Sequence, residues 1–488
     1  MKKPQILTAE KINGRYYTPL VIVESMLDLA GYTGVSITKK HIMENSCGDG
    51  AFLAEIVRRY CAVSLGLGEN RDTIRDELGR FVHGLEIDCD EWQKCIYNVS
   101  AVAAEYGVFD VDWDIKCANT LTVTEYSGKM DYVVGNPPYV RVHNLADYSN
   151  VKKYSFAQNG MTDLYIVFYE IGLSMLNQNG VLCYINPSSI FNSLAGEFAR
   201  RHFLTEHLLT KVVDLKHYQP FEATTYTAIV VLSKENRKDM VEYHEYDAKK
   251  GKIVFVDNVG YGDVYIDGSY YFADNRSFLA VSGIIRRNPS HGIFEVKNGF
   301  ATLFDDFFIG ELDFSDYTIP VVKASTGRMS TCFFPYDKKG ELVPYEVLAQ
   351  IPQIRQRYGQ HSEKLKSRSL ENADAWHGFG RSQGIQDVPK RKYAINTLIR
   401  DTSDIKLTVC EPGTGVYSGL YILTELEYGE LKEILFADDF VTYVKMLGKY
   451  KSGGYYTYSS KDLLKYLDYK YAERNGWDNE QLSIFGHT

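Results

Sequence analysis

The residues best suited to chemistry are four in a row, Asn136-Pro137-Pro138-Tyr139, directly after a short apolar run that a glycine ends. Proline fixes φ, lacks an N–H and keeps the residue before it out of the helical region, so this segment is a stiff, extended tip. Such a tip suits a flat ring that bears an amino group: the Asn136 oxygen and the Pro137 carbonyl would accept the amino hydrogens, and Tyr139 would stack on the ring. The same residues also fit a rigid turn between a strand and a loop.

Glycines in a second segment could bring backbone N–H groups close to a ligand. Residues 41–50 read as a strand that ends in Ser46-Cys47-Gly48-Asp49-Gly50, and a helix is expected over 51–60. Glycine permits close approach of the backbone, and the start of a helix offers unpaired N–H groups. No Lys-Ser or Lys-Thr pair follows, so the turn is not an ATP phosphate loop. A merely tight connection would have the same pattern.

A carboxylate ends the next expected strand, 81–88, as Glu86 or Asp88, and a helix is expected near 90–106. In α/β domains that bind a nucleotide cofactor, a carboxylate at the tip of the second strand accepts hydrogen bonds from ribose hydroxyls. A solvated strand end explains the pattern equally well.

The elements that must position these residues alternate between strands and helices over some 220 residues. Further strands are expected over 111–117, 131–135, 180–186, 212–214 and 227–232, and further helices over 19–30, over 164–176 and from Pro187. Thr18 is the expected N-cap of the first helix, with Pro19 as its first residue. This alternation predicts an α/β fold with an open, Rossmann-like doubly wound sheet, whose ligands bind at the carboxyl ends of the strands.

The bulk composition limits the classes of protein to which the chain can belong. With 488 residues, a net charge of −9 and a pI near 5.7, the chain has no global attraction for nucleic acid, so any such contact needs a local basic patch. The eight cysteines are scattered without a Cys-x-x-Cys pair, which argues against structural zinc and fits a reducing cytoplasm. We expect no signal peptide, no membrane span and no metal.

The order of motifs, Tyr-Thr-Pro at 17–19, the glycine turn and then Asn-Pro-Pro-Tyr, resembles that of a known family. Residues 15–235 are similar to the catalytic domain of the TaqI-like gamma group of DNA adenine-N6 methyltransferases, type II enzymes of bacterial restriction–modification systems. The resemblance implies S-adenosyl-L-methionine as cofactor and methyl transfer to the N6 amino group of an adenine flipped out of duplex DNA. It further implies double-stranded DNA and a cognate restriction endonuclease as partners.

The resemblance also assigns residues to the site. The cofactor-binding residues it implies are Thr18, Glu44, Ser46, Cys47, Gly48, Gly50, Glu86, Asn119 and Asn136. The residues it implies for the target base are Asn136, Pro137, Tyr139 and Phe221. Two positions depart from the family pattern: Asn45 replaces a proline, and Asn119 replaces an aspartate that binds the adenine of the cofactor.

A local excess of basic residues lies at 351–400, with ten Lys or Arg against four Asp or Glu, although the net charge of the chain is negative. Lys and Arg neutralise phosphates, while Arg and Gln can read base edges. The residues expected to contact DNA are Arg355, Arg357, Arg381, Ser382, Gln383, Lys390 and Arg391. A solvated helix over 353–368 and an ordinary loop form the alternative.

These patterns predict a catalytic domain over 1–235, a linker or small β region over 236–290, and an α+β target-recognition domain over 291–488. Three functions stay open beside DNA methylation: methylation of adenine in RNA, methylation of glutamine in a protein, and a non-catalytic DNA-specificity subunit. Cytosine-C5 methylation is excluded because its cysteine nucleophile typically follows proline and the chain has no Pro-Cys.

Overall fold

The computed structural model describes residues 17–142, 150–158, 162–221, 225–287, 292–370 and 372–476. The chain divides into two compact units, Met1–Phe278 and Leu279–Thr488. The first unit contains the motifs predicted to bind the cofactor and the base. The second contains the basic window.

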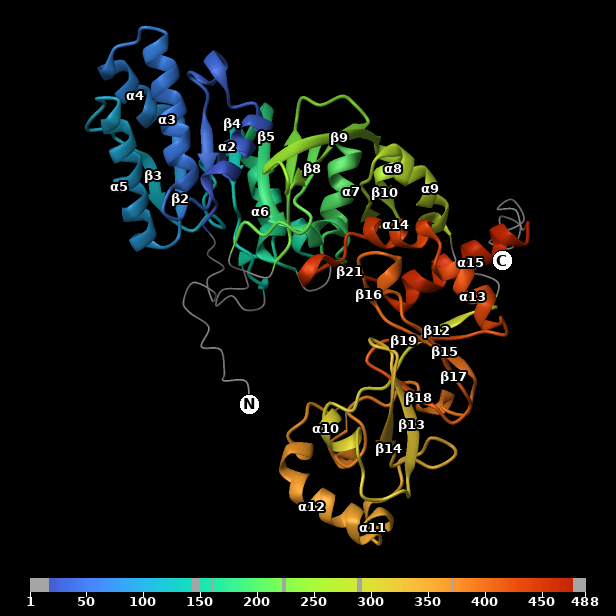
Figure 1. The fold of residues 1–488 in the computed structure, drawn as a ribbon. Helices are drawn as coiled ribbons and strands as arrows, with labels where there is room; N and C mark the ends of the chain where they lie inside the picture. Colours follow the sequence, from blue (N-terminus) through green and yellow to red (C-terminus); the bar gives the residue numbers. More distant parts are fainter. Residues whose placement is uncertain are drawn as a thin grey trace. The chain divides into compact units, whose positions relative to one another are not determined.

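A nine-stranded sheet in the order β3-β2-β1-β4-β5-β7-β6-β8-β9 forms the centre of the first unit (Figure 1). Its strands are β1 Ile42–Glu44, β2 Val82–Glu86, β3 Asp114–Cys117, β4 Met130–Gly135, β5 Leu176–Pro187, β6 Leu209–Asp214, β7 Thr227–Ser233, β8 Met240–Asp247 and β9 Lys252–Gly260. The five strands from β3 to β5 are parallel. β7 is antiparallel to both its neighbours, and β9 is antiparallel to β8.

Helices pack on both faces of this sheet. They are α2 Leu20–Ala30, α3 Ala51–Gly66, α4 Arg71–Phe81, α5 Cys89–Glu105, α6 Leu164–Met175, α7 Glu197–Thr205 and α8 Tyr261–Val264. Successive side chains of a strand point to opposite faces. Val133 of β4 belongs to the same core as the apolar side chains of α6 and α7, whereas Val134 belongs to the core formed with α2, α3 and α5. The predicted α/β fold with a mainly parallel, doubly wound sheet is therefore confirmed.

The structure differs from the predicted boundary at residue 235. β8 pairs in parallel with β6 and β9 pairs with β8, so residues 240–260, expected in a linker or small β region, extend the central sheet. The polar run that suggested a linker, 234–239, is the connection between β7 and β8. The rest of the expected linker holds the hairpin β10 Tyr265–Ile266 with β11 Ser269–Tyr270, followed by α9 Asn275–Arg286.

Three small sheets and several helices build the second unit. The sheets are β12-β19-β15-β17, β14-β13-β18 and β16-β21-β20. Their strands are β12 Glu295–Asn298, β13 Thr318–Lys323, β14 Arg328–Phe333, β15 Lys392–Ile395, β16 Leu398–Ile399, β17 Leu407–Cys410, β18 Gly415–Tyr417, β19 Leu420–Leu423, β20 Tyr450–Lys451 and β21 Tyr455–Thr457. The helices are α10 Asp305–Phe308, α11 Tyr345–Leu348, α12 Pro352–Lys366, α13 Tyr428–Leu435, α14 Asp438–Met446 and α15 Ser460–Arg474.

Aromatic side chains fill one core of this unit. They include Phe300, Phe307, Phe308, Phe333 and Tyr358, each almost completely buried. Many of the chain's numerous aromatic residues therefore serve packing. Within the residues that the structure describes, no helix combines the length and the apolar composition needed to cross a membrane.

Candidate active site

The three segments predicted to bind ligands meet at the carboxyl end of the parallel strands. β4 ends at Gly135. The side-chain nitrogen of the next residue, Asn136 Nδ2, donates to Thr18 Oγ1 over 3.2 Å. Ser46 Oγ, in the turn after β1, donates to the backbone carbonyl of Asn136 over 3.4 Å. Because the side-chain nitrogen of Asn136 faces Thr18, the side-chain oxygen Oδ1 of Asn136 is directed away from Thr18.

Thr18 does not cap the first helix as expected. The N-cap of α2 is Pro19, which makes no side-chain capping bond, and the first helical residue is Leu20. The Thr18 side chain is instead buried and accepts the hydrogen bond from Asn136. A residue that sequence patterns place at a helix end thus joins the motif that lies more than a hundred residues away.

The predicted base-stacking rings lie together. Tyr139 and Phe221 have ring centroids 6.3 Å apart with an interplanar angle of 74°, and the ring of Tyr165 of α6 lies 6.2 Å from that of Tyr139 at an interplanar angle of 80°. The Tyr139 hydroxyl donates to the backbone carbonyl of Ile185 over 3.2 Å. The rings of Tyr139 and Phe221 meet edge to face, so they would have to separate to hold a base between their faces.

The glycine turn has the backbone conformation that its sequence predicts. Gly48 and Gly50 have φ of 51° and 88°, in the left-handed region that favours glycine. A Cβ at Gly50 would lie 2.6 Å from the Cys95 sulfur of α5, so no larger residue fits there without a shift. The Gly48 N–H donates to Glu86 Oε2 over 2.9 Å, which ties the turn to the end of β2.

Cys47, in the same turn, is 3% exposed. Its hydrogen bond with the Cys95 thiol and its burial raise the pKa of the Cys47 thiol well above its ordinary value. A thiol that stays protonated is a poor nucleophile. The Cys47 side chain therefore serves the turn as a small, uncharged group.

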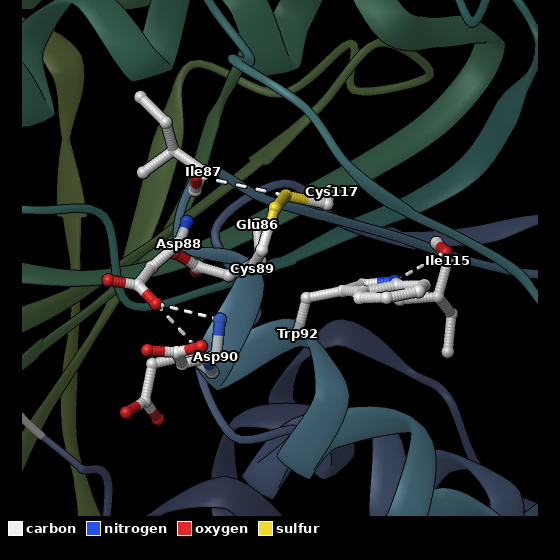
Figure 2. Close-up of a disulfide and its surroundings, with 9 residues drawn as sticks. Glu86, Ile87, Asp88, Cys89, Asp90, Trp92, Ile115 and Cys117 are labelled. Atoms are coloured by element: carbon white, nitrogen blue, oxygen red, sulfur yellow. Dashed lines mark hydrogen bonds between the residues drawn. A yellow bond between two sulfur atoms is a disulfide. The ribbon is translucent and has the colours of Figure 1, made fainter.

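Glu86 holds the loop that follows β2 (Figure 2). Its second carboxylate oxygen, Oε1, accepts from the Asp88 N–H over 2.9 Å, and Asp88 in turn caps α5 by accepting from the N–H groups of Asp90 and Glu91. Both Glu86 oxygens thus fix backbone around the place where a ribose was predicted. Each oxygen has further lone pairs that can accept a hydrogen bond from a ribose hydroxyl.

A disulfide between Cys89 and Cys117 lies beside Glu86 (Figure 2). In the parallel pairing of β2 with β3, Glu86 is opposite Cys117, and Cys89 begins α5 three residues after Glu86, so the two Cα atoms lie 5.3 Å apart. The expectation that the cysteines are reduced is therefore wrong for this pair. The other six cysteines are free and buried.

The two departures from the family pattern have structural roles. Asn45 is completely buried: its side-chain oxygen accepts from the Tyr184 hydroxyl over 3.0 Å, and its backbone carbonyl accepts from Thr120 Oγ1 over 2.6 Å. Asn119 Oδ1 accepts from the Leu121 N–H over 3.0 Å and so closes a local turn. Tyr184 lies inside an apolar strand, and nothing in the sequence marked it as a partner of the glycine turn.

Glu44, the last residue of β1, is 3% exposed. The Leu53 N–H donates to its carboxylate, while Oε2 has no hydrogen-bond partner among the described residues. Burial raises the pKa of this carboxyl well above its ordinary value, and the acidic groups nearby, Cys95, Asp49 and Glu86, raise it further. A buried acceptor without a donor is what a site for a polar or cationic ligand group would present.

In the second unit, several residues predicted to bind DNA are bound within the protein. The Arg357 guanidinium donates to the carbonyls of Phe307 and Asp306, at 2.9 and 3.3 Å. Lys390 pairs with Asp387 at 2.8 Å, and Arg391 pairs with Glu427 at 3.1 Å. Lys390 and Arg391 are nonetheless exposed, as are the remaining four, Arg355, Arg381, Ser382 and Gln383.

A stretch within the first unit matches a known protein family. Residues 51–221 match the family model described as Eco57I restriction-modification methylase. The type II methyltransferase M.BstVI of Geobacillus stearothermophilus is 30% identical over 241 residues, which are 46% of this chain and 43% of that protein. The type II methyltransferase M.PaeR7I of Pseudomonas aeruginosa is 27% identical over 235 residues, 46% and 40% of the two chains. The chain thus spans less than half the length of these two relatives.

A likeness of fold extends further along the chain. The type IIL restriction-modification enzyme MmeI, solved in complex with DNA, aligns with a TM-score of 0.64 at 14% identity, covering 91% of this chain and 63% of that one. At this identity the likeness shows a shared fold. The chain is therefore similar in sequence to type II methyltransferases over 46% of its length, and similar in fold to a restriction-modification enzyme over most of its length.

Proposed function

We propose that the chain transfers a methyl group from S-adenosyl-L-methionine to the N6 amino group of adenine in duplex DNA, as a gamma-group enzyme of a restriction–modification system. One observation carries the proposal: Asn136 is hydrogen-bonded to both Thr18 and Ser46. The tip that would hold the amino group is thereby joined to the two segments that would hold the methyl donor. The similarity of residues 51–221 to a restriction-modification methylase model supports the same reaction.

The residues of the site fit the cofactor. Glu44 presents a buried oxygen to which no described residue donates, Gly48 and Gly50 have backbone conformations that favour glycine, and Glu86 offers a carboxylate at the end of β2. The residues that would hold it are Thr18, Glu44, Ser46, Cys47, Gly48, Gly50, Glu86, Asn119 and Asn136. When bound, S-adenosyl-L-methionine supplies an electrophilic methyl group on a sulfonium centre.

The tip at residues 136–139 would act by holding the target amine in a reactive orientation. An aromatic amine is a poor nucleophile because its lone pair is delocalised into the ring. The Asn136 oxygen and the Pro137 carbonyl would accept its two hydrogens and direct the lone pair towards the methyl group. Alignment of this kind, with charge complementarity, supplies the rate gain without a titrating base. The protonated thiol of Cys47 agrees with a mechanism that needs no nucleophile from the protein.

The target adenine would leave the duplex and enter between Tyr139 and Phe221. Aromatic stacking is worth about 1–3 kcal/mol per base and offsets part of the cost of unstacking. Since the two rings are in edge-to-face contact at 6.3 Å, entry of the base must move at least one of them. In the second unit, the exposed side chains of Arg355, Arg381, Ser382 and Gln383 would contact DNA.

The test is methyl transfer from labelled cofactor to duplex DNA, RNA and protein in separate reactions. We expect label in the N6 position of adenine in DNA. Label in RNA or protein alone would favour one of the other methyltransferase functions. DNA binding without label anywhere would favour a non-catalytic specificity subunit.

Asn136→Ala should abolish transfer, because it removes one acceptor for the amine. It should weaken cofactor binding much less, because the other eight residues that would hold the cofactor remain. A matched control is Asn177→Ala, at the opposite end of the sheet, where the amide binds Asp131 at 3.2 Å. Transfer at the parental rate by Asn136→Ala would refute the role of the tip.

A further inference from the structure

The carboxyl group of Glu44 is in an unusual electrostatic position. Gly135, the last residue of β4, lies against it, since a Cβ there would be 3.3 Å from Glu44 Cγ. The titratable groups that act on the carboxyl most strongly are Cys95 of α5, Asp49 of the glycine turn and Glu86 of β2, and each disfavours its negative charge. All three are acidic. A negative charge on Glu44 would thus be buried among groups that disfavour it.

A second buried glutamate in the same unit shows the contrast. Glu55 of α3 is 2% exposed, but Arg58 binds it through two bonds of 2.6 Å and Arg59 through one of 2.7 Å. Although burial alone would raise the pKa of Glu55, these hydrogen bonds lower it. The fold supplies Glu55 with its counter-charge. Glu44 has one oxygen without a partner among the described residues.

Burying an ionised carboxylate without a counter-charge costs several kcal/mol, and such a group keeps its proton instead. The elevated pKa of Glu44 is the result of this cost. The proton and an incoming cation would then compete for the same carboxylate.

We infer that Glu44 is the counter-charge for a cationic group of the ligand, and that it gives up its proton to solvent when that group arrives. This inference rests on the proposed function, because S-adenosyl-L-methionine carries both an ammonium and a sulfonium charge. The exchange is balanced: a neutral carboxyl and a free cationic ligand become a carboxylate paired with the cation, and one proton passes to the buffer. Cofactor binding is therefore coupled to deprotonation of the site.

The test is isothermal titration of the protein with S-adenosyl-L-methionine at about pH 6, where the ligand's ammonium group is fully protonated. Titrations in two buffers of different ionisation enthalpy count the protons released. We expect release of up to one proton per site and an affinity that rises with pH by up to about tenfold per unit. S-adenosylhomocysteine keeps the ammonium and lacks the sulfonium, so release with this ligand as well would identify the ammonium as the partner.

Glu44→Gln keeps the shape and cannot lose a proton, so its binding heat should not depend on the buffer. Glu55→Gln is the matched control, and it should release the same number of protons as the parent protein. The melting temperature of each variant shows that it is folded, and the parent protein's own affinity against pH gives a second readout that needs no variant.

The outcomes separate the inference from the proposed function. Binding of the cofactor with a heat independent of the buffer and an affinity independent of pH would overturn the role of Glu44 alone. The same would follow if Glu44→Gln still released the parental number of protons. Absence of any binding heat, with unchanged melting temperature on adding the cofactor, would overturn the proposed function itself.

Discussion

Reduction of the Cys89–Cys117 disulfide should destabilise the first unit by several kcal/mol. The bridge closes a loop of 28 residues, for which the chain-entropy relation gives about 3.6 kcal/mol. The loop holds the whole of α5 and the connection into β3. Because the bridge restricts the unfolded chain far more than the folded one, the loss should appear in unfolding equilibria.

The folded geometry around the bridge has other restraints. The Trp92 indole N–H of α5 donates to the Ile115 carbonyl of β3 over 2.8 Å (Figure 2). The Ala118 N–H donates to the Glu86 carbonyl over 2.7 Å. These bonds hold the helix start against β3 after the sulfur–sulfur bond is cut. We therefore expect reduced protein to keep its native circular dichroism while its first-unit transition shifts to lower denaturant.

Two assays check this. Thiol titration of denatured protein should give six reactive groups before reduction and eight after it, since six of the eight cysteines are free. Urea unfolding with and without reductant gives the difference in free energy, and the double variant Cys89→Ser with Cys117→Ser should be insensitive to reductant. Eight thiols before reduction, or equal stability of the two forms, would refute the reasoning.

Four other substitutions test separate parts of the structure. Tyr184→Phe removes the bond to Asn45 and should cost about 1–3 kcal/mol, with weaker cofactor binding, measured by unfolding and titration. Burial lowers the pKa of Lys392 to about 8 from 10.5, so the folded state binds fewer protons between these values and stability should rise with pH there; Lys392→Met should abolish that rise in urea unfolding. Arg381→Ala should weaken DNA binding and lower its salt slope by about one, whereas Arg357→Ala should mainly lower stability.

Sequence patterns located the strands and the glycine turn of the first unit, because apolar runs that end in glycine or polar residues are typical of buried strands. β4 and the tip after it occupy the predicted positions, and β1, α3 and β2 follow in the predicted order. Sequence patterns did not indicate that residues 240–260 belong to the central sheet, because a polar turn and a linker have the same composition. The pairing of β8 with β6 is a long-range property that composition does not report.

The contacts that complete the site depend on which strands are neighbours. Cys89 and Cys117 are separated by 28 residues, and only the parallel pairing of β2 with β3 brings them together. The bond between Tyr184 and Asn45 likewise needs β5 to lie two strands from β1 in the sheet. The sequence of this chain, taken by itself, gives no indication of either contact.

The basic window shows how charge counts can mislead about DNA binding. Arg368 donates to the carbonyls of Thr302, Trp376 and Gly378, and Lys392, 1% exposed, donates to three carbonyls of the chain that precedes it. A cation satisfied by buried carbonyls cannot reach a phosphate without breaking the fold. Of the ten cations between 351 and 400, those that hold the second unit together must be subtracted before any patch is inferred. If the exposed segment 381–383 reads DNA, the salt dependence of binding should correspond to a few phosphate contacts, and a slope near ten would require cations from outside the window.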